Sequence, residues 1–395
     1  MYKRKEYDTL LRRIYEPRMF IQVLMGPRQV GKSTLIGQVV ASAAIPYLVF
    51  SADTVDAADS EWISRSWESA RATMSIHHHR EFLLVIDEIQ KIDNWSEHVK
   101  RQWDADTMSG TNLKVVLLGS SRLLLRKGLS ESLAGRFELV RIGHWSYCEM
   151  RDAFGWTLDR WIYFGGYPGS ARLVDDEKRW RRYVHDSLVA PSIEKDVVMT
   201  SKIYKPALMS QLFALGCAYS GEMLSLTKML GQLQDAGNVT TLQSYLNILR
   251  QCHLLTGLQK YAGDEARKYR SVPKFQVYNN ALLTAYQHTS FEAARVDTKA
   301  WGRWVESAVG VCLLAQAEEE EYEVYYWRDS NDEVDFIVNR GGRLTALEVK
   351  SGRRGMNSGL PRFAKEFRPD KSLVIGTDGI SLDDFFSANI VDVIA

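Results

Sequence analysis

The sequence has no excess charge of either sign and few cysteines. Its 395 residues carry 50 Lys and Arg against 49 Asp and Glu, a formal net charge of +1, so any nucleic-acid surface must be a local patch. The four cysteines (Cys148, Cys217, Cys252 and Cys312) are widely separated, which argues against a zinc site and against a disulfide framework.

Long apolar segments are also missing. No run approaches the length of a membrane span, and the charged first residues lack the apolar centre of a signal peptide. We therefore expect a soluble cytoplasmic protein that does not enter a membrane. At this length, two or three domains are expected.

A short apolar segment, residues 20–25, leads into the pattern G-x-x-x-x-G-K-S/T. The motif and the residue after it are Gly26, Pro27, Arg28, Gln29, Val30, Gly31, Lys32, Ser33 and Thr34. Such a loop turns its backbone N–H groups toward a phosphate, and the helix that follows adds its positive N-terminal dipole. Lys32 would reach the β- and γ-phosphates and the Ser33 hydroxyl would hold Mg²⁺. The motif predicts a site for ATP or ADP with Mg²⁺.

A second apolar run, residues 82–86, ends in two carboxylates, Asp87 and Glu88. A continuous apolar run is typical of a parallel strand covered on both faces. In P-loop ATPases a carboxylate at this position holds the Mg²⁺ shell, and a neighbouring Glu polarises the attacking water. We assign the metal to Asp87 and the water to Glu88.

Two further positions complete the predicted ATPase site. The strand-like residues 113–118 precede Ser120 and Ser121, which are either γ-phosphate sensors between the P-loop and Glu88 or ordinary helix N-caps. Arg136 stands before the next apolar run. It is either an arginine finger that completes a neighbouring subunit's site or a solvent-facing side chain at a strand start.

Six segments occur in a characteristic order: GPRQVGKST, LLVIDEIQK, LLGSS, SLAGR, HWSYCEM and FGGYPGS. With these segments in this order, the chain resembles the prokaryotic AAA-type P-loop ATPases that carry a C-terminal winged helix and a restriction-endonuclease-like domain. The resemblance implies ATP hydrolysis and assembly into homo-oligomers, and it supports the arginine finger in trans. We expect an α/β parallel-sheet P-loop domain over residues 1–155, a helical connector and winged helix over 156–295, and a small α/β nuclease-like domain over 296–395.

The middle segment has the pattern of a winged helix. Residues 226–233 and 239–251 predict two helices, and 254–261 and 274–278 predict two strands around a basic loop. The second helix should bury Leu242, Tyr245, Leu246 and Leu249, and the loop carries Arg267, Lys268 and Arg270. Such a module contacts DNA through the second helix and the wing, or it contacts only protein.

The last segment carries a second candidate site. Residues 301–315 predict a helix with Glu306 facing inward, and residues 322–327, 333–339 and 344–350 predict three strands. Asp335, Glu348 and Lys350 form the pattern D-x(12)-E-x-K, which resembles the PD-(D/E)xK nuclease superfamily. Asp335 and Glu348 would bind Mg²⁺ with help from Glu306, and Lys350 would stabilise or deprotonate the attacking water. A fold of this type also occurs without cleavage activity.

Two functions follow as hypotheses. The first is an ATP-driven machine acting on DNA, either alone or coupled to a metal-dependent nuclease-like domain. The second is a nucleotide-switched signalling or scaffolding ATPase, whose C-terminal domains bind protein partners and do not cleave DNA.

Overall fold

The structure is a computed structural model that describes residues 2–120, 125, 128–129, 132–193, 203–233, 237–263, 271–352 and 359–394. It divides into two compact units, Met1–Gly143 and His144–Ala395. The division lies before the predicted boundary at residue 155, because helix α6 (Tyr147–Phe154) buries Tyr147 and Met150 in the core of the second unit. The predicted second and third segments both belong to this second unit.

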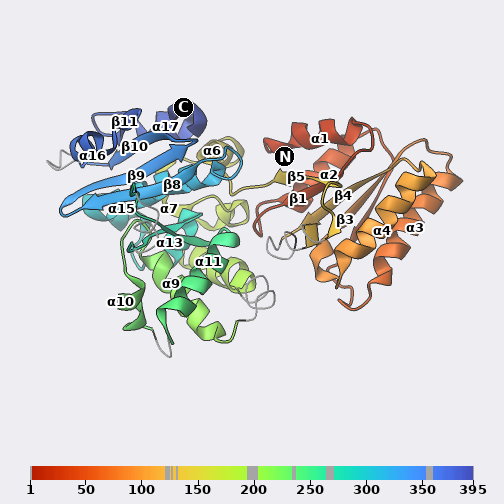
Figure 1. Ribbon diagram of the computed structural model, residues 1–395, viewed down its shortest axis with the longest axis horizontal. Helices are drawn as coiled ribbons and strands as arrows, with labels where there is room; N and C mark the ends of the chain where they lie inside the picture. The colour runs from red at the N-terminus through yellow and green to blue at the C-terminus, as the bar shows by residue number, and fades with distance from the viewer. Residues whose placement is uncertain are drawn as a thin grey trace. The chain divides into compact units, whose positions relative to one another are not determined.

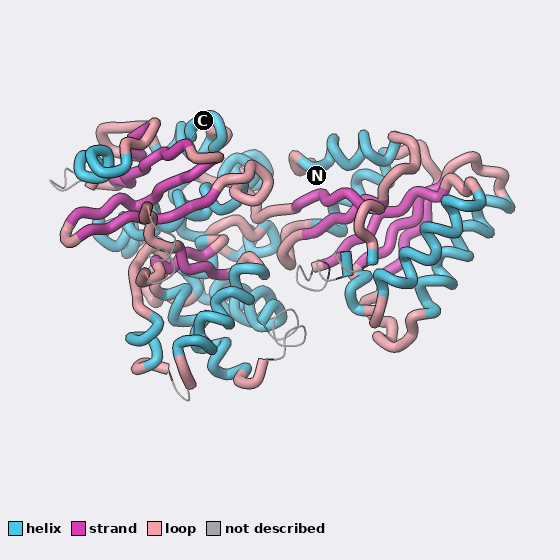
Figure 2. The backbone as a smooth tube through the Cα atoms, in the orientation of Figure 1, coloured by secondary structure: helices cyan, strands magenta, loops and turns pink. Residues whose placement is uncertain are grey.

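The first unit is built on a parallel sheet of five strands in the order β2-β3-β4-β1-β5. The strands are β1 (Ile21–Met25), β2 (Tyr47–Ser51), β3 (Phe82–Asp87), β4 (Leu113–Gly119) and β5 (Phe137–Arg141). Figure 2 shows them side by side between helices. The apolar runs of β1, β3 and β4 are buried, as expected for strands covered on both faces.

Helices cover both faces of this sheet (Figure 1). Helices α1 (Glu6–Tyr15) and α2 (Lys32–Ser42) pack on one face, and α3 (Glu61–Ile76) and α4 (Trp95–Ser109) pack on the other. A short 3₁₀ helix, η1 (Ile89–Lys91), follows β3. The two apolar layers hold the strand ends in fixed positions, which is what places the residues of the P-loop and of β3.

The second unit begins with helices and a two-stranded sheet. Its elements are α6, α7 (Leu158–Phe164), η2 (Pro168–Leu173), α8 (Glu177–Tyr183), the π-helix η3 (Val184–Val189), α9 (Pro206–Ala218), α10 (Leu226–Leu230), α11 (Val239–Gln251), β6 (Leu255–Leu258), β7 (Lys274–Val277), α13 (Asn280–Ala285) and α14 (Phe291–Val296). Strands β6 and β7 pair antiparallel. They follow α10 and α11 in the predicted order.

Helix α11 buries the predicted side chains Leu242, Tyr245, Leu246 and Leu249. The opposite face exposes Gln243, Ser244, Asn247 and Arg250. The predicted basic loop with Arg267, Lys268 and Arg270 lies outside the described residues. The identification of this module as a winged helix therefore stays a prediction.

The second unit ends in a mixed sheet in the order β11-β10-β9-β8. Its elements are α15 (Thr298–Gln316), β8 (Glu323–Asp329), β9 (Asp332–Arg340), β10 (Arg343–Lys350), α16 (Leu360–Phe367), β11 (Lys371–Gly376), α17 (Leu382–Ser387) and α18 (Ile390–Ile394). Strands β10 and β11 run parallel and the other pairs antiparallel. The three predicted strands are present, and β11 was not predicted. The mixed α/β class is confirmed, whereas the nuclease-like type of this domain stays a prediction.

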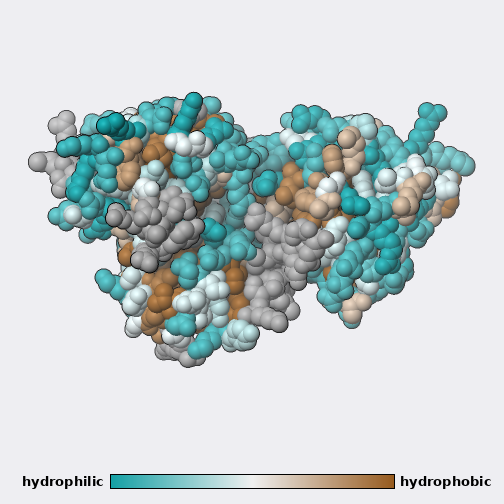
Figure 3. Space-filling model, in the orientation of Figure 1, coloured by the Kyte–Doolittle hydropathy of each residue, from teal (hydrophilic) through white to brown (hydrophobic). Residues whose placement is uncertain are grey.

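The surface is mixed in character. Figure 3 shows that the visible face of each unit is largely hydrophilic, with apolar side chains in small patches. Within the described ranges, no helix combines the length and the apolar character that crossing a bilayer requires.

Candidate functional site

The P-loop connects the carboxyl end of β1 to the first turn of α2. Gly31 is the N-cap of α2 and has φ 91°, in the left-handed region that favours glycine. A β carbon on Gly26 would lie 2.1 Å from the main-chain oxygen of Ile142, so close packing against the chain after β5 requires glycine there. Of the other loop residues, Gln29 is exposed and has φ 61°, Val30 is buried, and Thr34 is exposed. The strand, loop and helix therefore lie as the motif predicts.

Lys32 and Ser33 lie at the start of α2. The Lys32 ammonium is buried and donates to the main-chain oxygens of Gly26 at 2.9 Å and Pro27 at 2.7 Å. The Ser33 hydroxyl donates to Asp87 Oδ2 at 2.8 Å. A hydroxyl and a carboxylate oxygen are the hard ligands that Mg²⁺ prefers, so these two residues fit the predicted metal. Burial raises the pKa of Asp87, and the Ser33 hydrogen bond opposes that rise.

Glu88 is held by two neighbouring side chains. The Ser120 hydroxyl donates to Glu88 Oε2 at 2.8 Å, and the Gln90 amide donates to the same oxygen. Strand β4, which ends next to Ser120, lies between β1 and β3 in the sheet. Ser120 is therefore at the predicted position between the P-loop strand and Glu88, while Ser121 lies outside the described residues. Gln90 is not among the residues predicted from the sequence for this site, although it stands two residues after Glu88.

Arg136 lies at the other end of the sheet. It directly precedes β5, and its main-chain oxygen accepts from the Ile21 N–H at the start of β1, whereas the P-loop follows the carboxyl end of β1. Its guanidinium forms two bonds to the Asp104 carboxylate of α4, at 2.8 Å and 3.1 Å. Because the two ends of the sheet are apart, Arg136 cannot serve the P-loop of its own chain.

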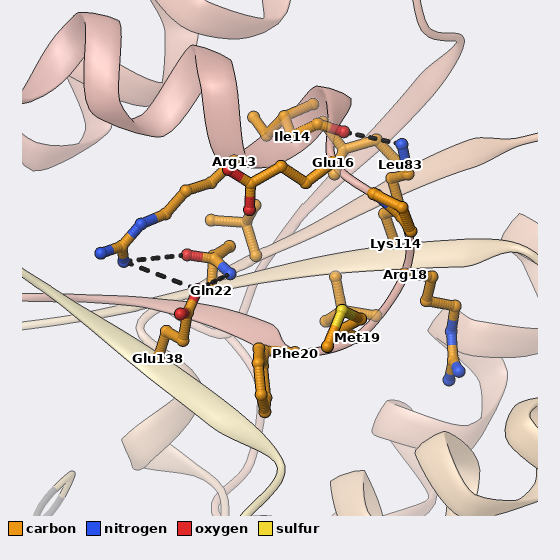
Figure 4. Close-up of a pocket in the computed structure, with 13 residues that line it drawn as sticks. Arg13, Ile14, Glu16, Arg18, Met19, Phe20, Gln22, Leu83, Lys114 and Glu138 are labelled. Carbon is orange, nitrogen blue, oxygen red and sulfur yellow. Dashed lines mark hydrogen bonds and ion pairs between the residues drawn. The ribbon is translucent and has the colours of Figure 1, made fainter.

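A cavity of about 250 Å³ also lies at the amino-terminal end of the strands (Figure 4). Arg13 donates to Gln22 at 3.2 Å, and Gln22 donates to Glu138 at 2.9 Å. Met19 and Phe20 belong to the lining and are exposed. This cavity is separate from the P-loop, and sequence reasoning did not find it.

The candidate residues of the C-terminal domain lie at the ends of β9 and β10. Phe336 pairs with Leu347 across these antiparallel strands, so Asp335 and Glu348 occupy the next position along each strand. Asp335 Oδ2 accepts from the main-chain N–H of Val349 at 2.7 Å, and Glu348 is buried. The predicted pairing of Asp335 with the E-x-K segment is therefore present.

The same cluster contains a cation that sequence reasoning did not find, Lys274 of β7. Its ammonium lies 2.5 Å from Glu306 Oε1, 3.5 Å from Glu333 Oε1 and 3.7 Å from Asp335 Oδ1. Burial raises the pKa of Glu306 to about 7, although the Lys274 ammonium opposes that rise. Lys274 is a lone cation in a four-residue buried strand, which is the signal that could have identified it.

The predicted metal ligands of this domain do not form a metal cage in the part of the chain that the structure describes. No group of three or more His, Cys, Asp or Glu side chains there is arranged to hold a metal ion. Lys350, at the end of β10, makes no ion pair with another described residue. The structure thus brings Asp335 and Glu306 together around Lys274, with Lys350 outside their ion pairs.

Family models match three successive parts of the chain. Residues 19–151 match a model described as an AAA domain. Residues 155–293 and 301–388 match two models described as domains of unknown function, DUF8612 and DUF4143. The first match supports an AAA-type P-loop ATPase domain in the first unit, and the other two cover successive segments of the second unit.

Two relatives with similar sequences carry names that describe them as uncharacterized proteins. A protein of Mycobacterium tuberculosis is 28% identical over 371 residues, which are 91% of this chain and 77% of that protein. A protein of Methanocaldococcus jannaschii is 24% identical over 281 residues, 65% of this chain and 58% of that protein. Among solved structures, a Walker-type ATPase of Pyrococcus abyssi has a TM-score of 0.50 and 15% identity, covering 72% of this chain and 96% of that one. This last likeness supports the P-loop ATPase fold.

Proposed function

We propose that the chain binds ATP at the P-loop and hydrolyses it. The observation that carries this proposal is the 2.8 Å contact between the Ser33 hydroxyl and Asp87 at the mouth of the P-loop. It joins the second residue of α2 to the carboxylate that ends β3, as a nucleotide-bound Mg²⁺ requires. The metal, when bound with ATP, would neutralise charge that develops on the phosphates.

The other side chains of the site have separate roles in binding the phosphates and orienting the attacking water. Lys32 exchanges its bonds to the Gly26 and Pro27 oxygens for bonds to the β- and γ-phosphates, which costs little because the ammonium already points into the loop. Glu88 orients the attacking water through its carboxylate. Ser120 and Gln90 hold one oxygen of Glu88, which leaves the other oxygen for the water.

Arg136 acts in trans in this proposal. It lies at the end of the sheet away from its own P-loop, so its guanidinium would contact the nucleotide bound by a second copy of the chain. An arginine placed at the γ-phosphate of a neighbour stabilises the transition state. The chain would therefore hydrolyse ATP as a homo-oligomer, and the Asp104 ion pair would hold Arg136 when no neighbour is engaged.

DNA is the first target to test. Helix α11 exposes a polar face with Arg250, and the sequence that follows β6 contains Arg267, Lys268 and Arg270. Clustered cations are typical of contacts to phosphates. The second candidate is a nucleotide-switched scaffold that binds protein partners. It is favoured by Lys274, whose ammonium contacts Glu306 and Asp335, two of the carboxylates predicted to bind a metal.

One experiment tests the ATPase and its target together. ATP turnover of the full chain is measured with Mg²⁺, with and without duplex DNA. The wild-type protein is compared with Lys32→Ala and with a variant in which Arg267, Lys268 and Arg270 are alanine. We expect Lys32→Ala to lose roughly a hundredfold or more in kcat/KM, because a charged contact to the phosphates is lost.

The outcomes separate the hypotheses. Wild-type turnover by Lys32→Ala would contradict the nucleotide site. DNA stimulation that disappears in the triple variant would support action on DNA. A rate that DNA does not change would favour the scaffold, and ATP-dependent capture of a defined protein partner would then be measured.

A further inference from the structure

Lys274 is one of the most deeply buried charges in the described part of the second unit. Its side chain is 1% exposed, and it lies in β7 between helix α15 and strand β9. Its ammonium contacts Glu306 of α15 and both Glu333 and Asp335 of β9, and it also donates to the main-chain oxygen of Asp335 at 3.3 Å. Three carboxylates from two elements therefore converge on one cation from a third element.

The position of this cation does not fit a divalent metal held jointly by Glu306 and Asp335, two of the three ligands that the sequence predicts. A divalent ion must gather several oxygens at 2.0–2.6 Å around one point. The Lys274 ammonium already occupies the point that Glu306 and Asp335 share, and the second oxygen of Asp335 accepts from the Val349 N–H. A metal could enter only if Lys274 left, and its charge would then be buried without partners, which is strongly unfavourable.

We propose that Lys274 takes the place of a divalent metal in the C-terminal domain. The second unit then folds and works without a metal ion at Glu306 and Asp335. The ammonium instead links two parts of that unit: β7 belongs to the segment matched over residues 155–293, and α15 and β9 belong to the segment matched over residues 301–388. This inference goes beyond ATP hydrolysis and does not depend on it.

The surrounding charges agree with this assignment. Three carboxylates face one buried ammonium, and Glu333 also lies 3.9 Å from Arg328. Arg303, on the same helix as Glu306, is paired with Glu222 at 3.2 Å and donates to the main-chain oxygen of Ser220. Among the described neighbours, Lys274 is therefore the cation that contacts all three carboxylates, and its removal would leave mutually repelling negative charges.

The first test measures metal binding by the wild-type protein itself. Free Mn²⁺ is followed by electron paramagnetic resonance during titration of the nucleotide-free full chain, beside the Asp335→Asn and Glu306→Gln variants. We expect the wild type to bind no Mn²⁺ through Asp335 or Glu306. Neither substitution should therefore lower the amount of Mn²⁺ bound. A bound ion that is lost in both variants would overturn the proposal.

The second test measures the contribution of the ammonium to stability. Thermal unfolding of Lys274→Met is compared with Lys299→Met, a control at an exposed lysine of α15. We expect Lys274→Met to lower Tm by roughly 6 °C or more, and the wild-type Tm to be equal in EDTA and in Mn²⁺. Equal Tm values for the two lysine variants would contradict the proposal, and so would a wild-type Tm that Mn²⁺ raises through Asp335. If Lys274→Met does not fold while Lys299→Met and Lys274→Arg do, the need for a cation at this point is supported.

Discussion

The ion pair between Arg136 and Asp104 predicts opposite effects of two substitutions on ATP turnover. Both side chains are 33% exposed and the pair is bidentate, so its contribution is about 1 kcal/mol at most. Arg136 must leave Asp104 to reach a neighbouring subunit, and breaking the ion pair costs free energy. Asp104→Asn removes this free-energy cost. Turnover should then rise by up to about fivefold.

Arg136→Ala should have a much larger and opposite effect. Loss of an arginine finger lowers kcat by roughly a thousandfold or more, although both substitutions remove the same ion pair. Each should change the Tm of the first unit by only about 2–4 °C. Arg101→Ala, at an exposed position of α4, is the control for a lost surface cation.

The assay is steady-state ATP turnover at several protein concentrations, because an arginine acting in trans requires assembly. Mixing inactive Arg136→Ala with inactive Glu88→Gln should restore activity, since the second chain supplies an arginine to the intact site of the first. The reasoning would be refuted if Asp104→Asn and Arg136→Ala lost turnover equally. Failure of the mixture to exceed either variant alone would also refute action in trans.

Two more predictions concern the P-loop end of the sheet. Ser120→Ala removes one of two hydrogen bonds to Glu88, so kcat should fall about tenfold with KM unchanged, and Gln90→Ala should act in the same direction; an unchanged kcat would contradict this role. Burial raises the pKa of Asp87, so the stability contributed by this group falls as the pH rises through its folded-state pKa. Asp87 accepts from the Ser33 hydroxyl with one oxygen and from the Glu88 N–H with the other, and Asp87→Asn keeps one acceptor while removing the charge. The Tm of the wild type relative to that of Asp87→Asn should therefore fall as the pH rises through the folded-state pKa of Asp87, while the variant loses ATP turnover. A difference in Tm that does not change with pH would contradict this account.

Most of the fold of the first unit could be predicted because its signals are local. The apolar runs before Gly26 and Asp87 predicted two of the buried strands, and both are present as β1 and β3. The eight-residue P-loop has its conformation set by two glycines and by the helix that follows. The buried face of α11 was also read correctly from its spacing of apolar residues.

The less regular parts of the second unit were harder to predict. Strand β11 pairs with β10 in parallel, and its partly exposed residues lack the continuous apolar pattern of β3. Helix α6 packs into a core whose other members come from distant segments, and the first compact unit ends before it, at Gly143. Such packing leaves no mark within the segment itself.

The sequence by itself determined which residues form the nucleotide loop and which strands carry the carboxylates. Residue spacing within a short segment sets the local backbone geometry. The backbone geometry in turn sets the positions from which those side chains project. Tertiary structure alone decided the partners. Ser120 lies 32 residues from Glu88, and Lys274 lies 59 residues from Glu333. A buried charge needs a partner from whichever segment packs against it, and only the folded chain brings those segments together.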